Sequence, residues 1–329
     1  MRLAVEILCM SNLLFCLMGP TASGKTALAC ELVEQFPLEI ISVDSAMIYR
    51  GMNIGTAKPD VETLSKAPHH LIDVLDPTDS YSAALFCEEV ARLRQEINHR
   101  GHIPLLVGGT MMYFHALQQG LSLLPEADLP TRAFLIQEAE MHGSLYMHQW
   151  LARVDPETAA RLHPNDTQRV QRALEVYELT SKPLSAFFER EKNRPAYEFV
   201  NFILMPEDRQ WLHQRIASRF LQMLDEGLIH EVEDLLTKWD LSSNHPSMRM
   251  VGYRQVLAYL RGEDSYATLS EKGIAATRQL AKRQLTWLRH WPQSQCFSAE
   301  NPTTRDEIVA IMKQILDNLH QSLPGEKNV

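Results

Sequence analysis

The sequence predicts an α/β fold in which a mainly parallel sheet is flanked by helices and interrupted by an all-helical insertion. Short apolar runs, typical of buried strands, alternate with longer segments whose apolar residues recur at helical spacing. Such alternation is typical of βαβ units, whose strands run parallel. Between about residues 111 and 194 the strand signals disappear and helical patterns dominate. We therefore expect a core of residues 1–115 and 195–329 around a helical insertion domain of residues 116–194.

The expected elements follow one another in a regular order. Four apolar runs bounded by Gly, Pro or Asp have the composition of buried parallel strands, and they are residues 13–18, 39–43, 103–107 and 197–205. Segments with apolar residues three or four positions apart are expected to be amphipathic helices, and they are residues 25–36, 82–100, 207–225, 228–239, 252–261 and 265–291. Gly101 and Pro292 follow two of these helices as stop signals.

The composition is that of a folded protein of a reducing compartment. The 329 residues are 45% hydrophobic, and an aromatic content of 8% excludes a disordered chain. The five cysteines are scattered, and His69, His70 and His163 lie in predicted loops without a matching metal-ligand pair. Because no apolar run is long enough to span a bilayer, we expect a cytoplasmic protein, monomeric by default. The net charge of −9 argues against a general nucleic-acid binder, although a local basic patch can override that total.

Residues 19–26 form a phosphate-binding motif. The segment Gly19-Pro20-Thr21-Ala22-Ser23-Gly24-Lys25-Thr26 matches G-x-x-x-x-G-K-[ST] and lies between a predicted strand and a predicted helix, as this motif requires. Backbone amides and the helix N-terminus attract phosphate oxygens, Lys25 adds a positive charge, and Thr26 can bind Mg²⁺. The expected sheet is therefore P-loop NTPase-like. A chance match on a surface loop is the alternative, and the motif alone favours a nucleotide kinase or ATPase without fixing the reaction.

Asp44 follows the second predicted strand. Ligands of parallel α/β sheets bind outside the carboxyl ends of the strands, so Asp44 and Lys25 are expected to face one crevice. A carboxylate there can act as a general base or bind Mg²⁺, and the alternative is a turn-forming or helix-capping residue. The following residues 45–59 contain two glycines, a proline and two cations. That composition indicates a shaped active-site wall, with a plain solvated loop as the alternative.

Five segments together resemble the tRNA isopentenyltransferase family, whose members are also called tRNA dimethylallyltransferases. They are the phosphate loop, Asp44-Ser-Ala-Met-Ile-Tyr-Arg-Gly-Met-Asn-Ile-Gly-Thr-Ala-Lys-Pro59, Leu105-Leu-Val-Gly-Gly-Thr110, Arg249-Met-Val-Gly-Tyr-Arg254 and Thr277-Arg-Gln-Leu-Ala-Lys-Arg-Gln-Leu-Thr-Trp-Leu-Arg289. The resemblance extends from about residue 13 to residue 297 in the order of the family. The block of residues 44–59 is far more specific than the phosphate loop.

The resemblance implies an enzyme that transfers a dimethylallyl group from dimethylallyl diphosphate to N6 of the adenosine just 3′ of a tRNA anticodon. The phosphate loop would then bind a diphosphate leaving group instead of delivering a γ-phosphate. By resemblance, Asp44 is the general base for the N6 proton, Thr21 donates to the oxygen that bridges allyl carbon and diphosphate, and Lys25 and Arg219 are cations for the diphosphate. Mg²⁺ is the implied cofactor, with Thr26 as its ligand. The absence of a Cys/His cluster after Cys296 in the sequence favours a bacterial-type enzyme.

Basic residues concentrate near the predicted C-terminal helices. Residues 249–290 contain five more Lys and Arg than Asp and Glu, and Arg278, Lys282 and Arg289 lie close to one helical face. Such a face suits an anticodon stem-loop, although a charged helix face is often only solvated surface. By resemblance, tRNA contacts come from Asp44, Ser45, Ala46, Met47, Thr110, Arg132, Gln168, Arg169, Val170, Gln171, Arg172, Arg249, Met250, Val251, Gly252, Tyr253, Arg254, Lys282, Arg283, Gln284, Leu285, Thr286, Trp287, Leu288 and Arg289.

One departure from the family and two other functions bear on this interpretation. Family members often have Gln where this chain has Met47, within the segment that contacts the target base, so hydrogen bonds from a side-chain amide to adenine are lost. The other functions are a small-molecule kinase that uses ATP and a non-catalytic RNA-binding NTPase. No lid arginine pattern supports the first, and the second has no need of Asp44 beside the loop. Whether ATP also enters the loop stays open.

Overall fold

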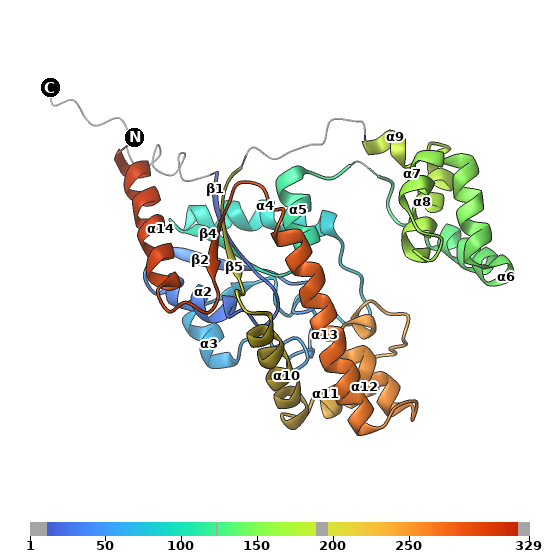
Figure 1. Cartoon of the computed structure of the whole chain (residues 1–329). Coiled ribbons are helices and arrows are strands. Elements are labelled where there is room, and N and C mark those ends of the chain that lie inside the picture. Colours follow the sequence, from blue (N-terminus) through green and yellow to red (C-terminus); the bar gives the residue numbers. More distant parts are fainter. Residues whose placement is uncertain (1–11, 123, 189–196, 322–329) are drawn as a thin grey trace. The chain divides into compact units, whose positions relative to one another are not determined.

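The computed structural model describes residues 12–122, 124–188 and 197–321, which belong to two compact units (Figure 1). The first unit comprises Met1–Ala116 and Ala196–Val329, and the second comprises Leu117–Pro195. The sequence predicts the insertion at residues 116–194. Among the described residues, no helix is long and apolar enough to cross a membrane.

A parallel sheet forms the centre of the first unit, as the alternation of strand and helix signals predicts. Its strand order is β3-β2-β4-β1-β5-β6, and every pairing is parallel. The strands are β1 Leu13–Met18, β2 Leu38–Val43, β3 His69–His70, β4 Ile103–Gly108, β5 Glu198–Met205 and β6 Ser294–Ser298. All residues of β1 and β4 are buried, which explains why both read as continuous apolar runs. The prediction of a parallel α/β sheet flanked by helices is confirmed.

Two short edge strands differ from the sequence prediction. β3 has two residues, His69 and His70, and the prediction placed both in a loop. β6 begins two residues after Pro292 and is largely polar, with only Phe297 buried. Neither segment carries the apolar run or the period-two alternation that marks a strand in sequence, because each pairs with only one neighbour at the sheet edge.

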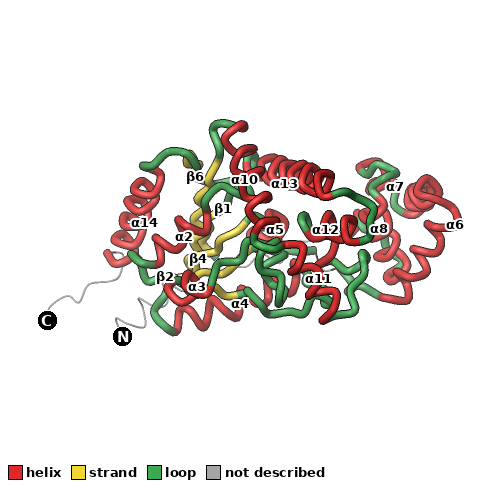
Figure 2. Tube along the Cα trace, turned by 90° about the horizontal axis from the view of Figure 1, so that it is seen from below, coloured by secondary structure: helices red, strands yellow, loops and turns green. Residues whose placement is uncertain are grey.

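Helices cover the sheet. One face packs against α2 (Lys25–Val33) and α14 (Thr304–Gln321), whose apolar residues join those of the strands in a single cluster. Figure 2 shows α2 and α14 on the side of the strands away from α12 and α13. The prediction lacked α14, although Ile308, Met312 and Ile315 occur at helical spacing. It also lacked α3 (Val61–Lys66), which has no buried residue.

The remaining helices of this unit are α4 Ala83–His99, α5 Met111–Gln119 (which continues into the second unit), α10 Arg209–Asp225, α11 Leu228–Lys238, the 3₁₀ turn η1 Ser247–Arg249, α12 Tyr253–Leu260 and α13 Tyr266–Leu288. Most of them lie close to their predicted positions, and α5 and η1 are additions to the prediction. Gly101, just after α4, has φ 79°, a conformation that favours glycine, and so serves as the stop signal that the sequence indicates. The long α13 packs against α10 and α12.

The second unit is built from helices: α6 Leu129–Val154, α7 Pro156–Arg161, α8 Thr167–Thr180 and α9 Ser185–Phe188. It has its own apolar core, in which Leu135, Leu151 and Leu174 are fully buried. Gly143 interrupts α6 with φ 81°. Asp155 and Asp166 cap the helices that follow them, since each accepts a backbone N–H from the first turn.

Candidate active site

A pocket of about 920 Å³ opens at the carboxyl ends of the central strands of the first unit. Segments that are far apart in sequence line it: residues 21–27, 44–47, 55–57, 108–112 and 249–252, together with side chains of α10 and α13. The phosphate loop follows β1, Asp44 follows β2, and Gly109 follows β4. The pocket therefore lies at the sheet edge where parallel α/β proteins bind ligands.

The phosphate loop contains two residues in the left-handed backbone region, which glycine favours and alanine rarely adopts. Gly24, the residue before α2, has φ 93°, and Ala22 has φ 64°. Gly19 lies so close to its neighbours that a Cβ would stand 2.8 Å from Ser23 Oγ and 2.9 Å from the Leu204 carbonyl oxygen. The first turn of α2 thus presents its N-terminus and its unpaired amides toward the pocket, as an anion site requires.

Lys25 lies at the floor of this pocket. Its ammonium donates a hydrogen bond of 2.6 Å to the Pro20 carbonyl and approaches Ser23 Oγ at 3.5 Å. Part of the side chain remains accessible from the pocket, yet the pKa of Lys25 is lowered to about 7, chiefly by burial of the ammonium and also by Arg219, while Asp44 acts in the opposite direction. A bound anion would favour the charged form of Lys25.

Two arginines of α10 serve different purposes. Arg215 donates from Nε to the Ala22 carbonyl at 2.8 Å, and its guanidinium lies over the Trp211 ring, so it braces the phosphate loop. Arg219, one turn later, also lines the pocket. Burial lowers its pKa, whereas the nearby Asp44 carboxylate raises it. The predicted diphosphate cation Arg219 is thus in the pocket, and the bracing role of Arg215 was not predicted.

Asp44 is both a turn-forming residue and a carboxylate of the pocket, the two interpretations that the sequence leaves open. One carboxylate oxygen accepts the N–H of Ala46 at 2.8 Å and that of Met47 at 3.4 Å, so the side chain does form a turn. The other oxygen has no hydrogen bond to the described residues, and the carboxylate lines the pocket with Lys25 and Arg219. Thr110 accepts the Ser45 N–H at 3.1 Å and fixes the same turn to the end of β4.

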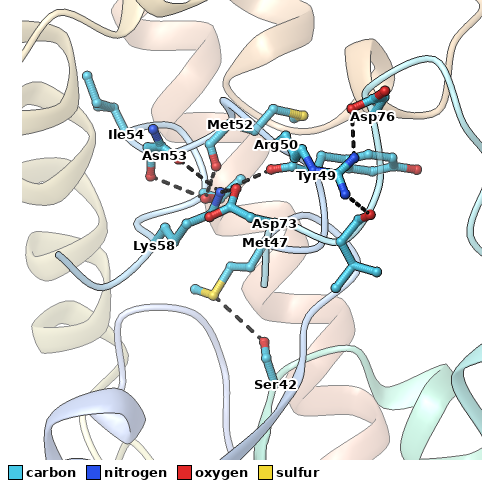
Figure 3. Close-up of polar contacts among 12 residues, drawn as sticks. Ser42, Met47, Tyr49, Arg50, Met52, Asn53, Ile54, Lys58, Asp73 and Asp76 are labelled. Carbon is cyan, nitrogen blue, oxygen red and sulfur yellow. Dashed lines mark hydrogen bonds and ion pairs between the residues drawn. The ribbon is translucent and has the colours of Figure 1, made fainter. Parts of the chain in front are cut away.

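The cations of the loop at residues 45–59 bind protein groups (Figure 3). Lys58, whose side chain is 4% exposed, donates to the Tyr49 carbonyl, Asn53 Oδ1 and Asp73 Oδ1 at 3.0, 2.9 and 2.6 Å. Arg50 pairs with an Asp76 carboxylate at 2.9 Å and with the Val74 carbonyl. These cations shape the pocket wall that the sequence predicts; in this structure their charges are directed at protein acceptors.

Met47 is the departure from the family pattern, and it lies in the pocket lining. Ser42 Oγ donates to its sulfur at 3.9 Å, a long contact that Figure 3 also shows. The thioether can accept only weakly and cannot donate. The side chain at this position therefore offers a ligand no hydrogen-bond donor.

Glu231 of α11 holds the other side of the same loop. Its carboxylate accepts the backbone N–H groups of Asn53, Ile54 and Gly55 at 2.8, 2.6 and 3.1 Å, and also the Tyr253 hydroxyl at 2.7 Å. Tyr253 is fully buried, and its pKa is raised by burial and by Glu231. Gly55 is required beside it, since a Cβ would lie 2.6 Å from the ring. Sequence reasoning missed Glu231, because the three loop amides that it binds are more than 170 residues away along the chain.

The predicted tRNA residues of α13 do not share one surface, because they point to different sides of the helix. Arg283, Gln284 and Trp287 line the pocket. Lys282, Leu285 and Arg289 instead line a second concavity, of about 460 Å³, between α10 and α13. Thr286 is exposed and lines neither cavity, while Leu288 is 1% exposed and packs in the interior. Leu288 is therefore a packing residue whose side chain is not accessible to RNA.

The segment around η1 shows the same division between pocket and interior. Arg249, Met250, Val251 and Gly252 line the pocket, whereas the Tyr253 side chain is a buried partner of Glu231. Arg254 lies outside the pocket lining. The family pattern across these residues thus reflects packing as well as a ligand surface.

The predicted tRNA contacts of the insertion belong to the second unit. Arg132 and Arg172 both pair with the buried Glu175, at 2.8 and 2.7 Å; the Arg132 pair ties α6 to α8, whereas the Arg172 pair lies within α8. Val170 is 1% exposed and is part of the core, so it offers RNA no side-chain surface. Gln168 and Arg169 are exposed, Arg169 pairs with Asp166, and Gln171 is half-buried.

No group of three metal-binding His, Cys, Asp or Glu side chains occurs within the described part of the chain. The residues of the pocket nevertheless fit Mg²⁺, which prefers one or two protein oxygens and completes its coordination with phosphate and water. Thr26 at the start of α2 and Asp44 both line the pocket and offer such oxygens.

Comparisons with known proteins agree with this architecture. A family model described as IPP transferase matches residues 47–291. The chain is 60% identical over 309 residues to a tRNA dimethylallyltransferase of Legionella pneumophila, covering 94% of this chain and 99% of the relative. It is 53% identical over 302 residues to a tRNA dimethylallyltransferase of Coxiella burnetii, covering 91% and 97%. The crystal structure of a full-length tRNA isopentenylpyrophosphate transferase from Bacillus halodurans superimposes with a TM-score of 0.69 at 34% identity, covering 94% of this chain and 98% of that one. The chain belongs to the IPP transferase family.

Proposed function

We propose that this chain transfers a dimethylallyl group from dimethylallyl diphosphate to N6 of the adenosine just 3′ of a tRNA anticodon, and releases diphosphate. The observation that carries the proposal is the shared pocket, which combines a phosphate loop with two cations and a carboxylate. Relatives at 60% and 53% identity are tRNA dimethylallyltransferases.

Departure of the diphosphate is the step that the cations serve. As the allylic C–O bond breaks, negative charge develops on the diphosphate, and groups already directed at that position lower the barrier. Lys25, Arg219 and the amides of the phosphate loop fill this role, and the Thr21 hydroxyl donates to the bridging oxygen. Mg²⁺, held by Thr26, supplies further neutralisation of the leaving group when it is bound.

Asp44 acts on the acceptor. An adenine amino group is a poor nucleophile, so its attack depends on orientation as well as on loss of the N6 proton. The oxygen of Asp44 that is not used in the turn is available to accept that proton. Because the target base must leave its stack to reach Asp44, the pocket has to admit a flipped-out nucleotide, and its volume permits this.

The RNA is held by the pocket-facing residues of α13 and of the 249–252 segment. Arg249, Arg283 and Trp287 combine positive charge with an aromatic ring that is 41% exposed. Cations and an exposed ring suit the phosphates and bases of an anticodon loop. We place the enzyme in the cytoplasm, as a monomer, with Mg²⁺ as its cofactor.

One incubation tests the proposal. The protein is mixed with dimethylallyl diphosphate, Mg²⁺ and unmodified tRNA, and the digested RNA is analysed by mass spectrometry for N6-isopentenyladenosine. Formation of this nucleoside without ATP is the expected result. Phosphate transfer from ATP to a small molecule would instead identify a kinase, and absence of the nucleoside with an otherwise folded protein would refute the proposal.

A further inference from the structure

Gln284 bridges the phosphate loop and the end of β4. Its side chain is almost fully buried: Oε1 accepts the Thr21 N–H at 2.9 Å, and Nε2 donates to the Gly109 carbonyl at 2.9 Å. One amide thus connects three elements, since Gln284 belongs to α13, Thr21 to the phosphate loop and Gly109 to the segment after β4. A contact with RNA does not account for this geometry, because both ends of the amide are used within the protein.

Gly109 leaves the space that the Gln284 amide occupies. A Cβ on Gly109 would lie 2.4 Å from Gln284 Nε2, so the glycine makes room for the side chain. The Thr21 N–H would otherwise have to find another acceptor in the loop. Loss of the amide therefore leaves a donor and an acceptor of two different segments unpaired at once.

The position of Gln284 on α13 gives the bridge a functional meaning. Two neighbours of Gln284 on this helix, Arg283 just before it and Trp287 about one turn after it, line the pocket. This is the pocket where we place the RNA. Thr21, at the other end of the bridge, is the residue that faces the departing diphosphate. Any displacement of α13 would therefore move the Thr21 peptide or break the bridge.

We propose that Gln284 is a positioning residue that couples RNA binding on α13 to diphosphate binding in the phosphate loop. It holds the Thr21 peptide in the conformation that receives the diphosphate, and RNA bound to the pocket-facing residues of α13 holds the helix in the position from which Gln284 reaches Thr21. Coupling between two sites is reciprocal, so each ligand tightens the binding of the other. The RNA part of this inference rests on the proposed function; the diphosphate part does not.

The first experiment measures binding of inorganic diphosphate with Mg²⁺ by calorimetry. Gln284→Ala is expected to weaken binding by roughly 5- to 100-fold, the range for two lost hydrogen bonds. Gln284→Glu keeps the size and an acceptor for Thr21 but loses the donor to Gly109, so it should also bind weakly. Gln279→Ala is the matched control, since Gln279 lines the concavity on the other side of α13. Wild-type affinity in both Gln284 variants would overturn the proposal.

A double-mutant cycle separates positioning from a general loss of folding. Gly109→Ala should displace the amide and weaken diphosphate binding to a similar extent. In the Gln284→Ala background the same change meets no Nε2 atom, and the remaining close neighbour of the new Cβ is the Gly19 carbonyl oxygen at 3.2 Å. The double variant should therefore bind only slightly more weakly than Gln284→Ala alone. Fully additive losses would show that the two residues act independently and would contradict the bridge.

The coupling itself is measured with an anticodon stem-loop RNA. In the wild type, saturating inorganic diphosphate and Mg²⁺ should raise affinity for this RNA at least about 5-fold, and in Gln284→Ala this increase should disappear. An increase that persists in the variant refutes the coupling. If the wild type binds no RNA but the variants still lose diphosphate affinity, the proposed function fails while the positioning role stands.

Discussion

Two neighbouring cations of α13 allow a direct test of where the RNA lies. Arg283 and Lys282 are adjacent and exposed, and successive residues of an α-helix point about 100° apart. Arg283 lines the pocket, whereas Lys282 lines the concavity between α10 and α13. Family resemblance assigns both to tRNA. If the target base enters the pocket, Arg283→Ala should weaken RNA binding and Lys282→Ala should leave it nearly unchanged.

The expected loss follows from the release of counterions. Each phosphate contact contributes about 0.7 to 0.9 to the slope of log K against log salt concentration. Removal of one contact should lower affinity about four- to six-fold at roughly 0.15 M salt, and should flatten the slope by the same 0.7 to 0.9. Any additional contact of Arg283 with a base would increase the loss without changing the slope.

The assay is fluorescence anisotropy of a labelled anticodon stem-loop, titrated at several salt concentrations without dimethylallyl diphosphate. Because the two variants remove the same charge from the same helix, a difference between them reports position and not net charge. Equal losses of RNA affinity in the two variants would mean that the RNA contacts both sides of α13. A larger loss for Lys282→Ala would move the RNA to the second concavity and refute the placement of the base in the pocket.

Three further predictions concern chemistry, loop order and pH. Asp44→Asn, which keeps the turn-forming oxygen, should lower single-turnover prenylation about 10²- to 10⁴-fold with little change in RNA affinity; near-normal turnover would remove Asp44 from the role of base. Glu231→Gln should raise hydrogen exchange of the Asn53–Gly55 amides at least about tenfold, since charge-assisted bonds are lost, whereas Glu233→Gln on the same helix should not. The pKa of Glu39 is lowered to about 2, chiefly by its hydrogen bond to Arg100, and its side chain is 13% exposed. Its ionised form thus contributes stability that is present above pH 4.5 and lost as pH falls toward 2. Glu39→Gln should lower the free energy of unfolding in urea at pH 7, by at most about 3 kcal/mol, with a difference that shrinks below pH 4.5; a difference independent of pH down to 3 would argue against this account.

The sequence predicts the parts of the fold in which local pattern and environment agree. β1, β4 and the long helices α4, α10 and α13 are buried or amphipathic along their whole length, so their signals are continuous. β3 and β6 depend on pairing with one neighbour and carry no such signal. For the site, motif matching found the phosphate loop and Asp44, and the family resemblance added distant pocket residues such as Arg219, Arg249 and Arg283.

What sequence reasoning missed was the support of the site from distant segments. Glu231, Arg215 and the bridging role of Gln284 depend on which elements meet in space, and no spacing along the chain reports that. The same limit affects a contiguous motif on a helix. The sequence predicts that residues 282–289 form one tRNA-binding surface. The helix instead directs their side chains to the pocket, to a second concavity and to the interior.

The distribution of charge explains how an acidic chain can bind two polyanions. Lys58, Arg50 and Arg215 are near the pocket, but each is directed to a carboxylate or a carbonyl of the protein. Lys25, which also donates to the Pro20 carbonyl, and Arg219 are the cations that we assign to the diphosphate, while Arg249 and Arg283 of the same pocket are assigned to the RNA. Burial lowers the pKa values of Lys25 and Arg219, so their charged forms gain from an anion. Against them stand Asp44 and a diphosphate with roughly three negative charges. Two cations do not balance this total, and the proposed Mg²⁺ supplies the missing two charges. We therefore expect removal of Mg²⁺ to slow departure of the diphosphate, because the remaining cations do not neutralise the charge that develops on it.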